Sequence, residues 1–254
     1  MTTSQHAFTV EQYETRANDY VASAVHSTGA DLDLMEAQVR GLGAARVLDL
    51  GCGGGHVSYR AAPHVAEVVA CDVTPAMLQA VMASAAERGL SNIKVQQAPA
   101  ERLPFADATF DVVLCRFTTH HWQDMEAGLR EARRVLKPDG RAVFTDTIAA
   151  ADPVLDTHLQ AVELLRDVSH VRNYSLAEWI AALSRLGFAV SSLSAHRLRM
   201  EFASWIARTR APELHAQAVR SLQQTAPPAV KAYFAIGEDG SFDLEVATLV
   251  ADPA

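Results

Sequence analysis

The 254-residue sequence has few of the features that mark secreted, membrane-spanning or metal-binding proteins. It holds only three cysteines, an odd number without metal-site spacing, so we interpret them as small buried side chains near strand ends. No apolar run approaches the ~20 residues of a membrane span. The first residues lack the basic start and apolar core of a signal peptide. We therefore expect a cytoplasmic protein without a membrane span.

Clustered positive charge is also missing. The formal net charge is −8, and no run of Lys and Arg offers a phosphate-neutralising surface. A small-molecule substrate is therefore expected rather than a nucleic acid. The hydrophobic content of 49% supports one substantial core, so we predict a single domain over residues 1–254, as a monomer or homodimer. None of the scattered histidine triples has the spacing of a metal site.

The most informative stretch is residues 47–55, an apolar run that contains Asp49 and ends in a glycine cluster. This pattern predicts a buried parallel strand that feeds a nucleotide-binding turn. Glycine allows a tight reversal and brings bare backbone against a ligand. Gly51, Gly53 and Gly55 give G-x-G-x-G, whereas the third slot of the dinucleotide pattern G-x-G-x-x-G holds His56. The pattern therefore disfavours a dinucleotide.

An acid follows at the spacing of a β-α-β unit. Asp72 lies 23 positions after Asp49, close to the offset of about 20 residues at which a carboxylate meets a ribose diol. The alternative is an ordinary strand-end cap. Thr74 and Pro75 then predict the N-cap and first position of a helix that Gly89 ends.

The rest of the chain alternates strands and helices, which implies a doubly wound, mostly parallel sheet that binds ligands at the carboxyl ends of its strands. Two helices are expected within residues 9–42, with Asp31 as the N-cap of the second, and Ser175 with Glu178 predicts a capping box. Helices are further expected at 56–62, 75–88, 125–136, 153–167 and 176–186, with one or two more within 198–228. The expected strands are 47–50, 65–72, 93–97, 110–115, 141–146 and 188–193, followed by a hairpin of 233–236 and 242–250 whose last strand joins the sheet antiparallel.

Two segments are expected to cover the ligand site. Residues 1–43 form N-terminal helices over its mouth, where Tyr13 and Tyr20 are either packing residues or ligand contacts. Residues 149–176 break the β/α rhythm and predict a cap inserted between strands five and six. Its polar residues Asp167, His170 and Arg172 either meet the substrate or close the loop.

Three further motifs carry a family resemblance. Residues 100–105 spell A-E-x-L-P-F, residues 110–113 spell F-D-V-V, and His120-His121-Trp122 follows. Together with residues 130–141, they resemble the ubiquinone/menaquinone-biosynthesis-type (methyltransferase type 11-like) branch of the class I S-adenosylmethionine-dependent methyltransferases. The resemblance covers about residues 10–195 and implies a seven-stranded, Rossmann-like sheet with an antiparallel last strand.

The resemblance also implies S-adenosyl-L-methionine as cofactor and a small-molecule methyl acceptor. One position departs from the family pattern: Pro99 stands where an acid commonly receives the adenine amine. Backbone groups near Ala98 to Glu101 would then bind adenine, or adenine would be bound less tightly. The expected cofactor-binding residues are Tyr20, Asp49, Gly51, Cys52, Gly53, Gly55, Asp72, Val73, Met77, Pro99, Ala100, Glu101 and Arg116.

Methyl transfer from a sulfonium depends mainly on alignment, so a catalytic side chain is optional. If the acceptor is a hydroxyl or an activated carbon, His120 and His121 are the candidate bases, because neutral imidazole is present near pH 7. Alternatively they shape the pocket. Arg116 could pair with the methionine carboxylate, a substrate anion or a surface acid. A nicotinamide-dependent dehydrogenase and a non-catalytic S-adenosylmethionine-binding protein are the other function classes that the sequence leaves open.

Overall fold

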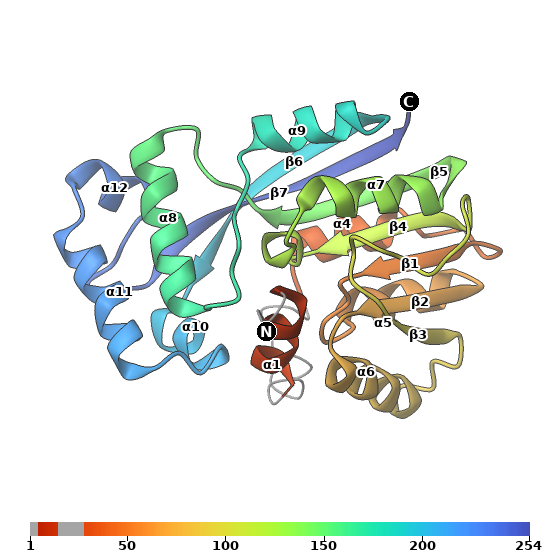
Figure 1. The fold of residues 1–254 in the computed structure, drawn as a ribbon, viewed down its shortest axis with the longest axis horizontal. Helices are drawn as coiled ribbons and strands as arrows, with labels where there is room; N and C mark the ends of the chain where they lie inside the picture. The colour runs from red at the N-terminus through yellow and green to blue at the C-terminus, as the bar shows by residue number, and fades with distance from the viewer. Residues whose placement is uncertain (1–4, 15–27) are drawn as a thin grey trace.

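The computed structural model describes residues 5–14 and 28–254, which form a seven-stranded sheet flanked by helices (Figure 1). The strands are β1 (Arg46–Leu50), β2 (Glu67–Asp72), β3 (Ile93–Gln97), β4 (Phe110–Arg116), β5 (Leu136–Thr147), β6 (Phe188–Met200) and β7 (Phe242–Pro253). The helices are α1 (Gln5–Tyr13), α4 (Ala30–Ala37), α5 (His56–Ala61), α6 (Pro75–Glu87), α7 (Met125–Val135), α8 (Pro153–Arg166), α9 (Leu176–Arg185), α10 (Phe202–Arg208), α11 (Glu213–Thr225) and α12 (Pro228–Tyr233).

The strand order is β3-β2-β1-β4-β5-β7-β6. Neighbouring strands from β3 to β5 pair in parallel, whereas β7 pairs antiparallel with both β5 and β6. This is the doubly wound, mostly parallel sheet with an antiparallel last strand that the sequence predicts, and that prediction is confirmed.

Both faces of the sheet are buried at its central strands. In β1, Leu48 and Leu50 pack on the side of α7 and α9, whereas Val47 packs on the side of α4, α5 and α6. Since side chains alternate between the faces of a strand, a strand covered on both faces must be apolar throughout. This requirement explains why the first strand could be recognised from a continuous apolar run.

The capping box at Ser175 is confirmed, because its side chain accepts a hydrogen bond from the backbone of Glu178 and the Glu178 side chain bonds back. Asp124 and Asp152 cap α7 and α8 through their side chains in a similar way. Thr74 lies at the N-cap position of α6, but its side chain makes no capping hydrogen bond. The capping signal at Ser175 therefore located the start of α9 by the polar groups that its first turn needs.

The predicted hairpin of residues 233–236 and 242–250 is wrong. Residues 228–233 form α12, and the antiparallel partner of β7 is β6, in a register that joins Met200 to Phe242 and Phe188 to Pro253. Phe234 packs in the core of the helical layer, so tertiary burial overrides the local strand propensity of the aromatic pair. Strand β6 also runs past the predicted end at residue 193. The sequence did not show this extension, because most residues of β6 are at least partly exposed and no apolar run marks it.

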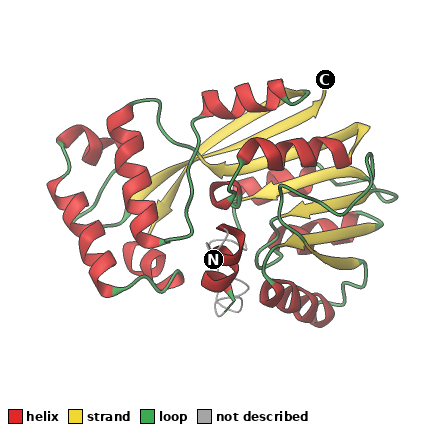
Figure 2. Ribbon diagram, in the orientation of Figure 1, coloured by secondary structure: helices red, strands yellow, loops and turns green. Residues whose placement is uncertain are grey.

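Strands β6 and β7 extend beyond the rest of the sheet and carry a second group of helices. β5 pairs with β7 only over residues 246–251, so residues 242–245 form a two-stranded arm with β6. Figure 2 shows the two strands reaching into the group formed by α8, α10, α11 and α12. Met200, Phe242 and Leu244 of the arm pack with Leu159 of α8 and Trp205 of α10. We call these four helices and the arm the cap layer. It contains α8, which belongs to the segment 149–176 predicted as a cap, and also the helices after β6.

Among the described residues, no helix has the length and apolar character needed to cross a membrane.

Trp179 tests the packing of the main core. It is 1% exposed on α9, and its ring centroid lies 5.8 Å from that of Phe144 in β5. We expect Trp179→Ala to lower the free energy of unfolding by about 3–5 kcal/mol in urea denaturation, because it leaves a cavity behind. The neighbouring Ile180 is 41% exposed, so Ile180→Ala should change it by about 0.5 kcal/mol or less. Equal losses for the two variants would contradict this packing.

Candidate active site

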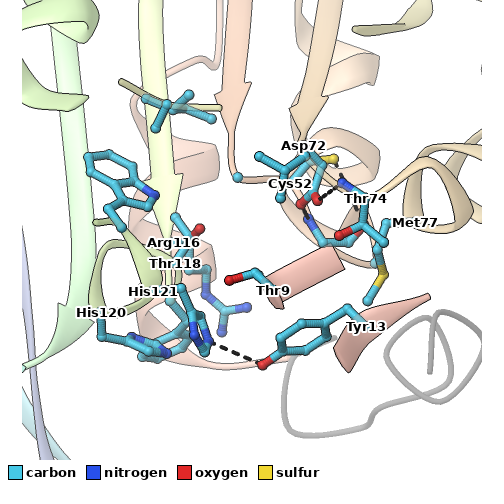
Figure 3. Close-up of a pocket in the computed structure, with 18 of the residues that line it drawn as sticks. Thr9, Tyr13, Cys52, Asp72, Thr74, Met77, Arg116, Thr118, His120 and His121 are labelled. Carbon is cyan, nitrogen blue, oxygen red and sulfur yellow. Dashed lines mark hydrogen bonds between the residues drawn. The ribbon is translucent and has the colours of Figure 1, made fainter. Parts of the chain in front are cut away.

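A cavity lies at the carboxyl ends of the parallel strands and continues beneath the cap layer. One end is lined by residues that follow β1, β2 and β4, together with α1 (Figure 3). The other end is lined by residues of α8, α10 and the β6–β7 arm. We call them the sheet end and the cap end. His120 and His121 line the cavity where the two ends meet, as their contacts with both parts show below.

The glycine turn after β1 has three residues with positive φ: 72° at Gly51, 47° at Gly53 and 81° at Gly55. A Cβ at Gly51 would lie 2.2 Å from Oγ1 of Thr118, and one at Gly55 would lie 2.8 Å from the Tyr59 ring. A Cβ at Gly53 would meet no described atom within 4 Å. Gly51 and Gly55 are therefore required by the protein's own packing, whereas Gly53 keeps its side of the turn open toward the cavity.

Asp72, at the end of β2, organises this turn. Its Oδ2 accepts a hydrogen bond from the backbone N–H of Gly53 at 3.0 Å, and its Oδ1 accepts one from Thr74 at 2.8 Å (Figure 3). Burial raises the pKa of Asp72, although these hydrogen bonds oppose the shift. The carboxylate thus caps backbone N–H groups at the end of its strand, which was the alternative role expected for Asp72. It also lines the cavity, where its remaining lone pairs can accept from hydroxyl groups.

Asp49 lies beneath the turn and is 1% exposed. The Ser58 hydroxyl of α5 donates to its Oδ2 at 2.6 Å. Burial raises the pKa of Asp49 to about 7, and the Ser58 hydrogen bond limits the rise. Its position ties the end of β1 to α5, and it also lines the cavity.

The loop after β3 supplies another wall of the sheet end. Val73, Met77, Ala98, Ala100 and Glu101 line the cavity, and so do Cys52 and Gly54 of the glycine turn. Pro99 and Gly55 are not among the lining residues. The carboxylate of Glu101 accepts from the backbone N–H of Gln123 at 2.9 Å and lies 3.0 Å from Nε2 of His6. Glu101 therefore ties this loop to α1 and to the start of α7.

Helix α1 lies across the sheet end, where His6, Thr9 and Tyr13 line the cavity (Figure 3). Oγ1 of Thr9 is buried and has no hydrogen-bond partner among the described residues. Such a group is costly unless a ligand or water satisfies it. Tyr20 lies outside the described residues.

Arg116 ends β4 and pairs with Asp31 of α4, both side chains being about 5% exposed or less. The predicted N-cap role of Asp31 is wrong. The N-cap of α4 is Gly29, and Asp31 lies in the first turn, where the buried guanidinium attracts its carboxylate. The guanidinium also lies over the Phe117 ring, 4.8 Å from its centroid. Arg116 lines the cavity from this buried pair, which excludes the surface ion pair among its expected roles.

His120 is fixed by Asp146 near the end of β5. Its Nδ1 lies 2.6 Å from Oδ1 of Asp146. Its carbonyl oxygen accepts hydrogen bonds from the backbone N–H groups of Val171 and Arg172, in the loop after α8. Burial lowers the pKa of His120, but the charge and hydrogen bond of Asp146 outweigh it, so the pKa lies above its usual value. The bond at Nδ1 leaves Nε2 as the nitrogen that can accept a proton.

His121 has a different environment. Its Nε2 lies 3.1 Å from the Tyr13 hydroxyl, and its Nδ1 lies 3.2 Å from both the carbonyl oxygen and Oγ of Ser169. The Tyr13 hydroxyl donates to Asp167 at 2.6 Å. Burial and the charge of His120 lower the pKa of His121 to about 4. Both ring nitrogens are thus engaged, and the ring links α1 to the loop after α8.

The polar residues expected to act from the cap hold this loop together. Burial raises the pKa of Asp167, but His121, Ser169 and Tyr13 outweigh it and bring the pKa below its usual range. His170 Nε2 lies 3.0 Å from Oε1 of Gln160, and burial together with the neighbouring histidines lowers its pKa to about 2. Arg172 pairs with Asp156 and Glu178. None of the three lines the cavity.

The structure adds residues that the sequence analysis missed. Asp146 could have been suspected, because it ends a predicted strand at the ligand-binding edge. Residues of the cap end gave no local signal, since they come from α8, α10, both strands of the arm, the end of β5 and the loop after α8. They are Thr147, Glu163, Arg166, Asn173, Leu198, Met200, Trp205, Arg208 and Leu244.

Known proteins agree with this geometry. The family model for the methyltransferase domain matches residues 48–144. The uncharacterized protein YafE of Escherichia coli is 44% identical over 200 residues, which cover 79% of this chain and 97% of YafE. The uncharacterized methyltransferase YcgJ of Bacillus subtilis is 38% identical over 200 residues, 79% of each chain. Its crystal structure matches with a TM-score of 0.85 at 34% identity, over 88% of this chain and 98% of that one.

A more distant relative is the ubiquinone/menaquinone biosynthesis C-methyltransferase UbiE of Idiomarina loihiensis. It is 37% identical over 105 residues, which cover 40% of this chain and 42% of UbiE.

The parallel sheet with its antiparallel last strand, and the glycine turn beside Asp72, define the class I methyltransferase fold. The chain belongs to the S-adenosylmethionine-dependent methyltransferases of this class, with S-adenosylmethionine as cofactor. The described residues fit this cofactor: Gly53 leaves open space, the Asp72 carboxylate borders it, and the unpartnered Thr9 hydroxyl lies in the same cavity.

We predict that Asp72→Ala weakens binding of S-adenosylhomocysteine about 5- to 150-fold, as measured by calorimetry. The reason is that unpaired polar groups in a closed site cost about 1–3 kcal/mol. Asp33→Ala is the matched control, because Asp33 is an exposed acid outside the cavity. An Asp72→Ala protein with a normal melting curve and parental affinity would place this acid outside the cofactor site.

Proposed function

We propose that the protein transfers the cofactor's methyl group to a small-molecule acceptor that binds at the cap end of the cavity, with His120 as the base. The observation that carries this proposal is the His120–Asp146 pair at the junction of the two ends. The acceptor atom is an oxygen, carbon or nitrogen whose proton must leave, in keeping with the use of a partly buried imidazole. The dehydrogenase alternative is set aside, since the chain belongs to the methyltransferases.

The sheet end would hold the cofactor through the residues that line it. The backbone of the glycine turn, the Asp72 carboxylate and the apolar side chains of Val73, Met77 and Ala100 form its walls. Arg116, which pairs with Asp31, also lines this end, and a guanidinium is a group that binds carboxylates. When bound, S-adenosylmethionine supplies an electrophilic methyl group that leaves its sulfonium by in-line displacement. Alignment of the acceptor with that group is the main task of the cavity.

His120 is better suited to proton removal than His121. Asp146 fixes the ring orientation and stabilises the imidazolium that forms when Nε2 takes a proton. His121 is held at both nitrogens, and its lowered pKa makes it a poor proton acceptor at neutral pH. We therefore assign His121 to positioning: it connects α1, through Tyr13, to the loop after α8.

The pH dependence of kcat tests this assignment. A base must be deprotonated, and Asp146 raises the pKa of His120, so the activity should rise with pH through a limb above about 6.5. His120→Gln should remove this limb and lower kcat by roughly 10²–10⁴. Asp146→Asn removes the charge that raises the pKa while burial still lowers it, so the limb should move below about 6.5.

His121→Gln is the matched comparison for the neighbouring ring. The limb should stay in place in this variant, whatever happens to its kcat. A limb that survives in His120→Gln and disappears in His121→Gln would reverse the assignment. Affinity for S-adenosylhomocysteine, measured on the same proteins, should stay near the parental value in all three variants.

We further propose that residues 1–254 act as a single methyltransferase domain in which α1 and the segment 149–176 close over the bound molecules. The support is a set of contacts between the two. Gln5 donates to the Ser169 carbonyl at 3.0 Å, and Tyr13 donates to Asp167 at 2.6 Å. Closing elements of this kind exclude water and complete the site.

Hydrogen exchange tests the closure. Amides of α1 and of residues 149–176 should exchange more slowly with S-adenosylhomocysteine present, whereas those of β1 and β4 should not change. Tyr13→Phe removes the hydroxyl that joins the two segments and should reduce this difference. Strong and equal protection in both states would show a rigid segment that does not close.

A further inference from the structure

Asn173 is a buried residue whose side-chain amide nitrogen has no hydrogen-bond acceptor among the described residues. It is 2% exposed and lines the cavity. Gln160 of α8 holds its main chain on both sides: the Asn173 N–H donates to Oε1 at 3.0 Å, and the Asn173 carbonyl accepts from Nε2 at 2.7 Å. Its own Nδ2 has no partner among the described residues. The backbone is thus fixed, and the side-chain donor is left for something else.

Leaving a buried amide unpaired is destabilising, and native proteins do so rarely. Asn92 shows the ordinary case in this chain: its Nδ2 donates to the carbonyl oxygens of Ala62 and Val65 at 2.8 and 3.0 Å. A residue with a fixed main chain and an unpaired side-chain donor is typical of a group that binds a ligand oxygen.

Part of the wall of the cap end is apolar. Its apolar residues are Leu198 and Met200 of β6, Leu244 of β7 and Trp205 of α10. Trp205 is 1% exposed and belongs to the core of the cap layer, so its position is fixed by packing. These side chains can surround the apolar body of a small molecule, and they offer no charge to it.

Three of the described residues that line the cap end are charged. Arg166 and Arg208 line it together with one carboxylate, Glu163. Arg166 donates to the Trp205 carbonyl at 3.1 Å and lies 3.5 Å from Glu163. Burial raises the pKa of Glu163, although the charge of Arg166 opposes the shift. Guanidinium groups bind carboxylates and other anionic oxygens, so an anionic group suits this end better than a cation.

We infer that the acceptor is a small molecule with an apolar body and an anionic oxygen, such as a carboxylate, that accepts a hydrogen bond from Asn173 and faces Arg208. This inference rests on the proposed function and names its substrate class. The reactive atom of such a molecule would lie toward His120, at the junction of the two ends, while the anionic oxygen lies under the cap layer.

The first test needs no acceptor. If Nδ2 of Asn173 is unpaired in the protein without acceptor, Asn173→Leu or Asn173→Ala should raise the Tm, measured with S-adenosylhomocysteine present. A rise of about 2–4 °C is expected. The same changes at Asn92 remove satisfied hydrogen bonds and should lower the Tm. If both Asn173 variants lower the Tm as much as the Asn92 variants do, the amide has a structural partner and the inference fails.

The second test uses three probes of matched shape: 4-hydroxyphenylacetate, the neutral 4-hydroxyphenylacetamide and the cation tyramine. Calorimetry on the protein saturated with S-adenosylhomocysteine should show the anion binding about tenfold tighter than the amide, and tyramine weakest. Asn173→Leu and Arg208→Met should remove this preference. Arg210→Met is the control, because Arg210 is an exposed neighbour that does not line the cavity.

The inference is overturned if tyramine binds as tightly as the anion, if no probe binds at millimolar concentration, or if both variants keep the parental order. Failure of the proposed function is a separate result. It would appear as parental kcat and an unchanged pH limb in His120→Gln with an identified acceptor, whatever the order of the three probes.

Discussion

The antiparallel pairing of β7 between β5 and β6 is the interaction on which the site depends. An extra parallel strand would have run in the same direction as β5. Because β7 is antiparallel and longer than its contact with β5, it and β6 project past the ligand-binding edge as an arm. The inner face of the arm carries Met200, Phe242 and Leu244, which must be buried. Two of the helices that bury them, α8 and α10, line the cap end of the cavity.

Three charged groups that are buried or partly buried around the cavity each contact an opposite charge or a hydrogen-bond donor. Arg116 has Asp31, His120 has Asp146, and Asp167 has the Tyr13 hydroxyl. Desolvation makes an isolated charge costly, whereas paired charges hold their elements in register. Each pair joins segments far apart in the sequence. The His120 ring, the N-terminal helix and the loop after α8 are therefore positioned together.

Two buried donors among the described residues have no partner, Oγ1 of Thr9 and Nδ2 of Asn173, and both residues line the cavity. Thr9 lies at the sheet end and Asn173 at the cap end. Stability would favour apolar side chains at both positions, so their presence fits a cavity shaped to receive polar molecules. The opposition between stability and binding is the physical basis for the test at Asn173.

The sequence by itself determined whatever depends on neighbours along the chain. The apolar run of β1, the positive φ values at Gly51 and Gly53, and the capping box at Ser175 are short-range requirements that residue types satisfy directly. The tertiary structure alone decided that Asp31 pairs with Arg116 and that Asp146 pairs with His120. It also decided that residues 228–233 are helical, although the aromatic pair Tyr233 and Phe234 at their end favours a strand. Those outcomes depend on burial and on charges brought together from distant segments, and no local pattern records which distant group will arrive.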